Sequence, residues 1–292
     1  MTLPYFGRFA SLAIDPIEKK PLYHFYPAAP ILSIGSVGCN LSCRFCQNWQ
    51  ISQPETVRSL DRLLPEQLAR LAAEKNVPLV AFTYNEPSIS AEYVIEASEV
   101  CHQLGLKTVA VTNGMISGAA REDFYKNVDG ANIDLKAFTP EFYHDLCGGD
   151  LAAVKETIAY VAQKTDVWLE LTTLLIPGRN DSDEELRALA DWVAATCGRD
   201  TPLHLSAFFP TYRLNDLPRT KPETLFRAEQ IARAAGLRYV YCGNIADTAH
   251  QTTRCPNCGE SLIERDGYRT RNRLAANGVC PACATKIAGR GL

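Results

Sequence analysis

Short apolar runs alternate with longer segments of helical character over the first 246 residues, and this alternation limits the possible folds most strongly. Strands are predicted at 31–37, 79–84, 107–113, 131–136, 167–176, 203–209 and 239–243. Helices are predicted at 65–75, 91–104, 119–126, 151–163, 183–195 and 222–235. Such alternation is typical of βαβ units and a parallel sheet, in which polar side chains at the carboxyl ends of the strands form the site.

The composition favours a globular cytoplasmic protein. Of the 292 residues, 46% are hydrophobic, and the longest apolar runs, 78–82 and 174–177, are far shorter than the roughly 18 residues of a membrane span. The first 16 residues carry Arg8 and Asp15 and lack the pattern of a secretion signal. A net charge of −3 gives no global reason to expect a nucleic-acid or membrane partner.

The chain changes character after residue 246, where a small cysteine-rich module is predicted. Two C-x-x-C knuckles, Cys255 with Cys258 and Cys280 with Cys283, are separated by residues 259–279. Facing knuckles of this kind bind one tetrahedral zinc, although a rubredoxin-like iron or an auxiliary 4Fe-4S cluster uses the same ligands. From residue 250 onward, the sequence has seven basic residues and three acidic ones. This excess of positive charge indicates a solvated face or a docking surface for an acidic partner or RNA.

A second cysteine set lies directly after the first predicted strand. Cys39, Cys43 and Cys46 form a C-x-x-x-C-x-x-C run. Three thiolates hold three irons of a 4Fe-4S cube and leave the fourth iron open for a substrate or cofactor, whereas a structural cluster takes four cysteines. The alternative is a zinc knuckle or a set of buried thiols.

The sequence resembles the radical SAM superfamily, whose motif has this cysteine spacing with an aromatic residue, here Phe45, before the last cysteine. It is similar most of all to the AmmeMemoRadiSam system radical SAM enzymes, and it also resembles the pyruvate formate-lyase activating enzymes. The segments that carry the resemblance are 15–27, 46–53, 83–87, 112–114, 134–136, 177–181 and the terminal cysteine module.

The resemblance implies an α/β fold with a partial (β/α)6 TIM-like radical SAM barrel at 28–246. An N-terminal extension, 1–27, would precede it, and a four-cysteine module of zinc-ribbon or rubredoxin-like type, 247–292, would follow. It also implies that a 4Fe-4S cluster reductively cleaves S-adenosyl-L-methionine to methionine and a 5′-deoxyadenosyl radical, which abstracts hydrogen from a substrate.

By motif position, the resemblance assigns the cluster to Cys39, Cys43 and Cys46 as catalytic ligands. Glu86 and its strand-end backbone are expected to meet the methionyl ammonium. Asn113 is expected at the ribose or the carboxylate, Lys136 at the carboxylate, and Phe45 beside the adenine, with Asp134 counted among the cofactor-binding residues. Zinc or mononuclear iron is expected at Cys255, Cys258, Cys280 and Cys283.

The resemblance also implies partners and leaves alternatives. A reducing partner of the flavodoxin or ferredoxin type is expected, and the family name implies Memo-like and AMMECR-like proteins. One alternative is an activating enzyme that installs a glycyl radical on a partner. That role is weakened because Val111 replaces an aspartate of those enzymes, and 209–212 lacks their histidine. The other alternative is a non-catalytic metal-binding adaptor.

Overall fold

A computed structural model describes residues 6–54 and 60–292 of the chain. Its main sheet has eight strands in the order β10-β9-β8-β7-β6-β5-β3-β2, and all pairs of neighbouring strands are parallel except β2 with β3. All seven predicted strands are confirmed: β3 (Pro30–Gly35), β5 (Leu79–Phe82), β6 (Lys107–Thr112), β7 (Gly130–Asp134), β8 (Trp168–Leu175), β9 (Leu203–Ala207) and β10 (Val240–Gly243).

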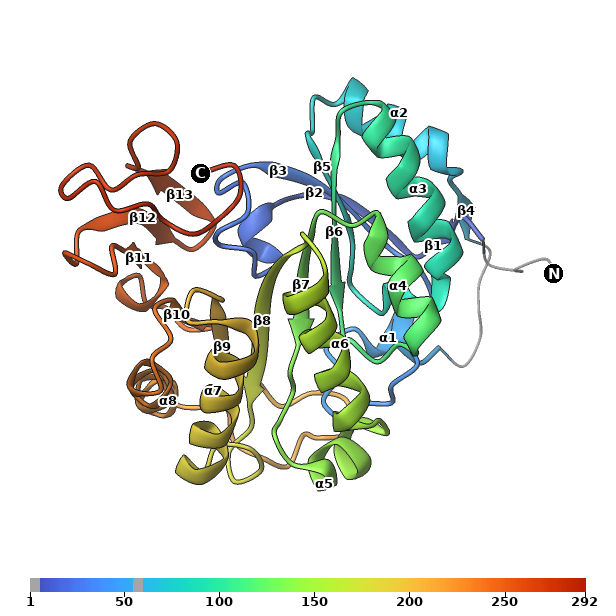
Figure 1. The fold of residues 1–292 in the computed structure, drawn as a ribbon. Helices are drawn as coiled ribbons and strands as arrows, with labels where there is room; N and C mark the ends of the chain where they lie inside the picture. Colours follow the sequence, from blue (N-terminus) through green and yellow to red (C-terminus); the bar gives the residue numbers. More distant parts are fainter. Residues whose placement is uncertain (1–5, 55–59) are drawn as a thin grey trace.

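Six helices connect these strands and cover the outer face of the curved sheet (Figure 1). Local signals set their ends: the Ser182 side chain accepts a hydrogen bond from the Glu185 amide at the start of one helix, and Gly236 takes a positive φ after the end of another. These are α2 (Pro65–Glu74), α3 (Ala91–Gln103), α4 (Gly118–Lys126), α6 (Leu151–Lys164), α7 (Asp183–Cys197) and α8 (Pro222–Ala234).

Short elements complete the main body. They are β1 (Arg8–Phe9), which pairs with β4 (Asp61–Arg62), the helices α1 (Trp49–Ser52) and α5 (Pro140–Phe142), the π-helical segment η3 (Tyr143–Cys147) and the 3-10 turns η1 (Ile17–Lys19), η2 (Pro87–Ser90) and η4 (Ala249–Gln251). In residues 6–54 and 60–292 we find no helix with the length and apolar character of a membrane span.

Strand β2 (Ser11–Pro16) was not predicted. It pairs antiparallel with β3, with Ser11 opposite Gly35 and Pro16 opposite Pro30. The strand carries the charged Asp15 and ends at Pro16, so its local pattern is weak, and β3 supplies the hydrogen bonds that stabilise it. In the part of the chain described, β2 and β10 are the two ends of the sheet and are not paired with each other, so the barrel is open.

The two faces of the sheet differ in chemistry. Residues on the outer face, such as Leu32, Ile34 and Phe82, pack with the helices in the largest apolar cluster. Because side chains alternate along a strand, the opposite face belongs to the barrel interior, and there it carries the buried polar residues Asn132 and Glu170.

Residues 17–29 cover the amino ends of the strands and form the floor of the barrel. The Glu170 carboxylate is fully buried and accepts hydrogen bonds from the backbone amides of Tyr23 and His24 at 2.9 and 2.8 Å. It also accepts from Trp168 Nε1 at 3.0 Å and contacts His204 Nε2 at 2.7 Å. The two amide hydrogen bonds attach the floor to the sheet, and the contacts with Trp168 and His204 hold the carboxylate within the sheet.

The C-terminal module packs beneath this floor, at the end of the barrel opposite the carboxyl ends of the strands (Figure 1). It contains a three-stranded antiparallel sheet of β11 (Thr253–Arg254), β12 (Ser261–Asp266) and β13 (Arg269–Asn272). Arg265 is 1% exposed, donates to the Tyr23 carbonyl at 2.7 Å and lies 3.9 Å from the centre of the Tyr23 ring. The module and the floor therefore share one buried polar network.

Candidate active site and metal centre

The loop that carries Cys39, Cys43 and Cys46 is held by backbone hydrogen bonds to η3. The amide of Ser42 donates to the Cys147 carbonyl at 2.8 Å, and the amide of Arg44 donates to the Leu146 carbonyl at 2.9 Å. Gly148 has a φ of 66°, and a Cβ at this position would collide with the Ser42 side chain. The glycine thus permits the close approach that fixes the cysteine loop.

The three cysteines of this loop differ in burial. Cys43 is 9% exposed, and Cys39 and Cys46 are half-buried. The Cys39 sulfur accepts a hydrogen bond from the Leu41 amide at 3.4 Å and lies 3.6 Å from Asn113 Nδ2. N–H donors aimed at a sulfur stabilise a thiolate, and they are a principal means of setting the potential of an iron–sulfur cluster.

A fourth cysteine, Cys147, lies beside Cys43 and is fully buried. A hydrogen bond from Cys147 and the positive charge of Lys136 together outweigh the effect of burial and lower the pKa of the Cys43 thiol to about 7. Cys147 follows the fourth predicted strand in the sequence, but its contact with the cysteine loop depends on η3, which is not among the predicted helices. π-Helical turns often occur at functional sites.

Glu86 joins the ends of β5 and β6. Its carboxylate is fully buried and accepts from Thr112 Oγ1 at 2.7 Å, the Asn113 amide at 2.7 Å and the Ser88 amide at 2.9 Å. Burial raises the pKa of Glu86, whereas these donors lower it. Because its oxygens are engaged within the protein, the carboxylate positions the strand ends and leaves nearby backbone groups to meet a ligand.

Asn113 follows β6 and reaches the cysteine loop. Its Nδ2 donates to Asn40 Oδ1 at 2.8 Å, and its Oδ1 accepts from the Met115 amide at 2.8 Å. Asn40 in turn donates to the Met115 carbonyl at 2.6 Å. Asn40 was not among the predicted site residues, although it directly follows Cys39 in the sequence.

Asp134 and Lys136 follow the buried part of β7 and pair with each other, with Lys136 Nζ 2.7 Å from Asp134 Oδ2. Burial acts to lower the pKa of Lys136, but the Asp134 carboxylate and the Cys43 thiol raise it well above its ordinary value. Lys136 is therefore a cation beside the cysteine loop. Its backbone amide donates to the Tyr143 hydroxyl of η3 at 3.0 Å.

Phe45 is 5% exposed and packs against Phe142, with ring centroids 5.8 Å apart. This burial gives Phe45 of the cysteine loop a packing role, and its contact with adenine stays a prediction. The structure thus gathers at the carboxyl ends of β3, β5, β6 and β7 all the residues predicted for the first site: Cys39, Cys43, Cys46, Phe45, Glu86, Asn113, Asp134 and Lys136.

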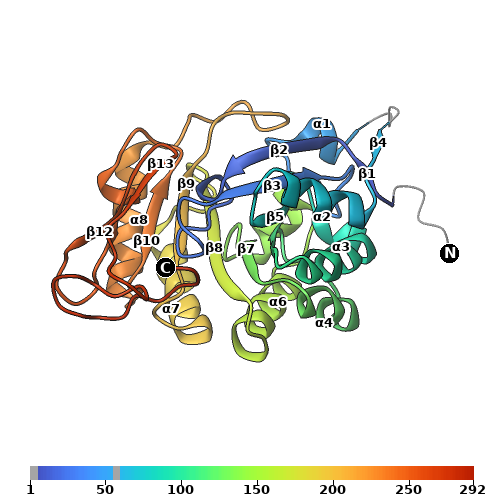
Figure 2. The same ribbon diagram turned by 90° about the horizontal axis from the view of Figure 1, so that it is seen from above.

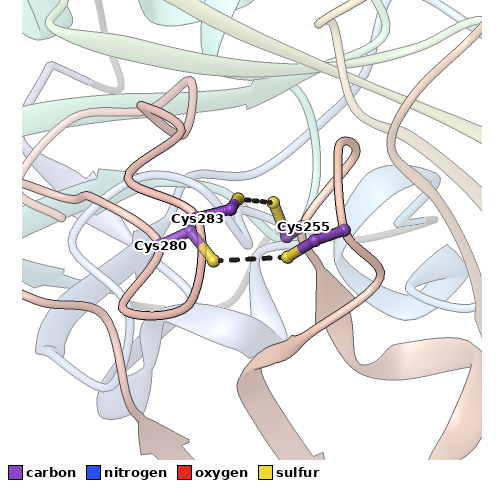
Figure 3. Close-up of side chains that lie close together, drawn as sticks. Cys255, Cys280 and Cys283 are labelled. Atoms are coloured by element: carbon purple, nitrogen blue, oxygen red, sulfur yellow. Dashed lines mark hydrogen bonds between the residues drawn. The ribbon is translucent and has the colours of Figure 1, made fainter.

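The second cysteine set converges at the other end of the molecule. Cys255 and Cys283 have sulfur atoms 3.5 Å apart, and those of Cys258 and Cys280 are 3.7 Å apart (Figure 3). All four sulfur atoms lie within 4.8 Å of one another. Four thiolates at about 2.3 Å from one zinc form a tetrahedron with edges of about 3.8 Å. The spacing fits a single ion.

The chemistry around these four cysteines also fits a metal. The Thr285 hydroxyl lies 3.2 Å from the Cys283 sulfur, and this hydrogen bond is the main cause that lowers the pKa of Cys283 to about 5. The Glu260 backbone lowers the pKa of Cys258, but hydrogen bonds with the neighbouring thiols raise it to about 12, so Cys283 ionises before Cys258. The thiolate is the form that binds a metal. Among residues 6–54 and 60–292, these four cysteines are the group of Cys, His, Asp or Glu side chains that brings three or more ligand atoms within 4.8 Å of one another. The thiolates of a 4Fe-4S cluster bind different irons and need not share one centre.

Comparison with known proteins agrees with this geometry. A profile of the Radical SAM superfamily matches residues 33–193. Uncharacterized protein MJ0808 of Methanocaldococcus jannaschii is 39% identical over 285 residues, which are 97% of this chain and 84% of that protein. The chain belongs to the radical SAM superfamily, and it is an S-adenosylmethionine-dependent enzyme. The adaptor alternative is therefore set aside.

Two further relatives bear on the subgroup and the fold. The 4-hydroxyphenylacetate decarboxylase activating enzyme of Clostridioides difficile strain 630 is 25% identical over 154 residues, or 52% of this chain and 47% of that enzyme. The crystal structure of a radical SAM methyltransferase from Sphaerobacter thermophilus has a TM-score of 0.56 at 19% identity, over 75% of this chain and 67% of that one. The first shows a relation to activating enzymes, and the second confirms the α/β radical SAM fold.

Proposed function

We propose that this enzyme uses a 4Fe-4S cluster on Cys39, Cys43 and Cys46 to generate a radical from S-adenosylmethionine. When bound, such a cluster supplies one electron that splits the sulfonium into methionine and a 5′-deoxyadenosyl radical, which abstracts hydrogen from a small-molecule or protein substrate. The convergence of the three-cysteine loop with Asn113 and Lys136 at one end of the barrel carries this proposal.

The residues around the cysteine loop bind different parts of S-adenosylmethionine. The Lys136 ammonium pairs with the methionyl carboxylate, with Asp134 keeping it charged. The backbone that Glu86 holds at the ends of β5 and β6 accepts from the methionyl ammonium, and Asn113 orients the ribose or the carboxylate. Phe45 lies on the adenine side. Together these groups position the ligand beside the open iron and exclude water from it.

We further propose the division 1–27, 28–246 and 247–292, with strand β2 of the N-terminal segment completing the sheet of the barrel. The four-cysteine module holds zinc or mononuclear iron as a structural ion. A module of about 45 residues has little apolar core of its own, so a metal is its main source of stability. The two short sulfur–sulfur distances support one shared ion over a cluster.

The finer family assignment is also a proposal. The segments 15–27 and 46–53 support an enzyme of the AmmeMemoRadiSam system, acting with Memo-like and AMMECR-like proteins. Binding of either purified protein to this enzyme, measured by anaerobic calorimetry, tests the association. Relatedness to an activating enzyme instead supports a glycyl-radical activating role. Formation of a glycyl radical signal on a candidate partner, seen by EPR, distinguishes the two roles.

Anaerobic reconstitution tests the central proposal. The enzyme with cluster, dithionite and S-adenosylmethionine should form 5′-deoxyadenosine and methionine, measured by liquid chromatography. Cys43→Ala should lose the iron–sulfur absorption and the cleavage while keeping its circular dichroism spectrum. Cys101→Ala is the matched control, because Cys101 is a fully buried thiol of α3, and it should keep both. A Cys43→Ala protein that assembles the wild-type cluster would refute the assignment.

A further inference from the structure

A strap of residues 208–221 leaves the end of β9 and crosses to the cysteine loop (Figure 2). The Arg213 amide donates to the Arg44 carbonyl at 2.9 Å, and the Tyr212 ring stacks on Trp49 with centroids 5.2 Å apart and planes 10° apart. Leu214, 2% exposed, anchors the strap. The strap thus places side chains from a distant part of the chain on the rim of the proposed cluster site.

The strap and the segment around the cysteine loop together carry exposed aromatic and basic side chains, which we call the rim patch. Trp49 is 37% exposed and Phe209 is 41% exposed, which is unusual for rings of this size. Arg213 lies over the Tyr212 ring at 5.0 Å, and Arg219 lies over the Phe209 ring at 5.6 Å. The rim patch comprises Arg44, Trp49, Phe209, Tyr212, Arg213 and Arg219.

The charge of the rim patch opposes that of the whole molecule. Residues 39–54 contain Arg44 and no other charged side chain, and residues 208–221 contain three basic side chains and the single acidic residue Asp216. The chain as a whole has a formal charge of −3. A local positive surface on an acidic protein, beside exposed aromatic rings, is a surface suited to an acidic protein partner.

We propose that the rim patch is the docking surface for an acidic one-electron carrier protein that reduces the cluster. The inference rests on the proposed function. In the reduction, one electron leaves the carrier, which is oxidised by one equivalent, and the cluster gains it. The carrier must approach the cysteine loop from outside, where Arg44 of that loop and Trp49 at the start of α1 are exposed. A substrate must instead reach the barrel interior, so the observations favour the carrier.

The experiment compares two reductants on the reconstituted holoenzyme. Reduced flavodoxin, an acidic carrier, depends on docking, whereas dithionite is a small ion that does not. The double variant Arg213→Glu/Arg219→Glu reverses two charges without altering a proposed ligand. Arg271→Glu is the matched control, because it reverses an exposed arginine of β13 in the C-terminal module.

At low ionic strength the double variant should be reduced by flavodoxin about tenfold to a hundredfold more slowly than the wild type, the range expected for electrostatic steering. Its reduction by dithionite and its S-adenosylmethionine cleavage with dithionite should be unchanged, and Arg271→Glu should behave as wild type. Added salt should slow the flavodoxin reaction of the wild type and narrow the difference.

Other results would overturn the inference. Equal flavodoxin rates for wild type and double variant would show that the carrier docks elsewhere. A slow rate for Arg271→Glu alone would move the docking surface to the C-terminal module. An unchanged flavodoxin rate combined with lost binding of a substrate protein would assign the rim patch to that protein. Failure of the wild type to cleave S-adenosylmethionine with dithionite would instead contradict the proposed function itself.

Discussion

Replacing Glu86 by glutamine tests whether its carboxylate organises the S-adenosylmethionine site. The amide can keep its oxygen toward Thr112 and Ser88, which share one carboxylate oxygen, but its NH2 group then faces the Asn113 amide. Two donors would oppose each other where a 2.7 Å hydrogen bond now lies. The change therefore acts on Asn113 while leaving the size of the side chain almost the same.

The expected magnitude follows from this single lost contact. A buried donor without a partner costs about 1–3 kcal/mol. Burial raises the pKa of Glu86, so a neutral side chain recovers part of the cost of burying charge. We expect the free energy of unfolding to fall by about 1 kcal/mol, the lower end of that range. Displacement of Asn113 should weaken S-adenosylmethionine binding at least tenfold, which corresponds to about 1.4 kcal/mol.

Urea unfolding and anaerobic calorimetry with S-adenosylmethionine provide the two readouts. Glu185→Gln is the matched control, because Glu185 accepts one hydrogen bond from the Phe138 amide at 2.7 Å and lies outside the proposed ligand set. Its amide oxygen can keep this hydrogen bond, so the variant should keep its stability and bind S-adenosylmethionine normally. If Glu86→Gln has wild-type stability and affinity, the carboxylate does not hold the strand ends as argued.

Two further perturbations test the C-terminal module and the floor. Cys258→Ser should lower the metal bound per chain, measured by mass spectrometry, and make residues 247–292 sensitive to protease while the iron–sulfur absorption stays unchanged; an unchanged metal content would exclude Cys258 as a ligand. Burial lowers the pKa of His24 from 6.5 to about 4. As the pH falls below 6.5, His24 is therefore protonated in the unfolded chain before it is protonated in the folded protein. The free energy of unfolding should decrease between pH 6.5 and pH 4. The loss should total about 3 kcal/mol, at most about 1.4 kcal/mol per pH unit. Urea midpoints between pH 7 and pH 4 measure it, with the exposed His144→Gln as control; a His24→Gln protein with the same pH slope as wild type would refute the assignment.

Much of the fold could be predicted because strand and helix patterns are local. The β-branched residues of 107–113 by themselves predict a strand, and Gly236 predicts a helix end because glycine readily adopts a positive φ. The grouping of the predicted site residues could also be predicted, because the carboxyl ends of parallel strands lie at one end of a sheet. Glu86, Asn113 and Lys136 therefore needed no tertiary information to be grouped.

The N-terminal segment shows where local reading fails. Asp15 is 7% exposed and contacts Lys20 at 2.7 Å and the Tyr84 hydroxyl at 2.6 Å, which are groups from the floor and from the end of β5. The sequence assigns residues 1–27 to an N-terminal extension, and it does not indicate which distant groups the polar side chains of 15–27 contact. The folded structure shows that its polar groups pair inside the molecule, with partners up to 264 residues away in the sequence.

The sequence by itself determined the strand and helix alternation, the two cysteine sets and the chemistry that each spacing permits. Ligand type and spacing are properties of a short stretch of chain. The tertiary structure decided that β2 joins the sheet, that Cys147 lies against Cys43, and that the strap meets Trp49. Each of these contacts joins segments distant in sequence, and burial and hydrogen bonding select such contacts only when the whole chain has folded.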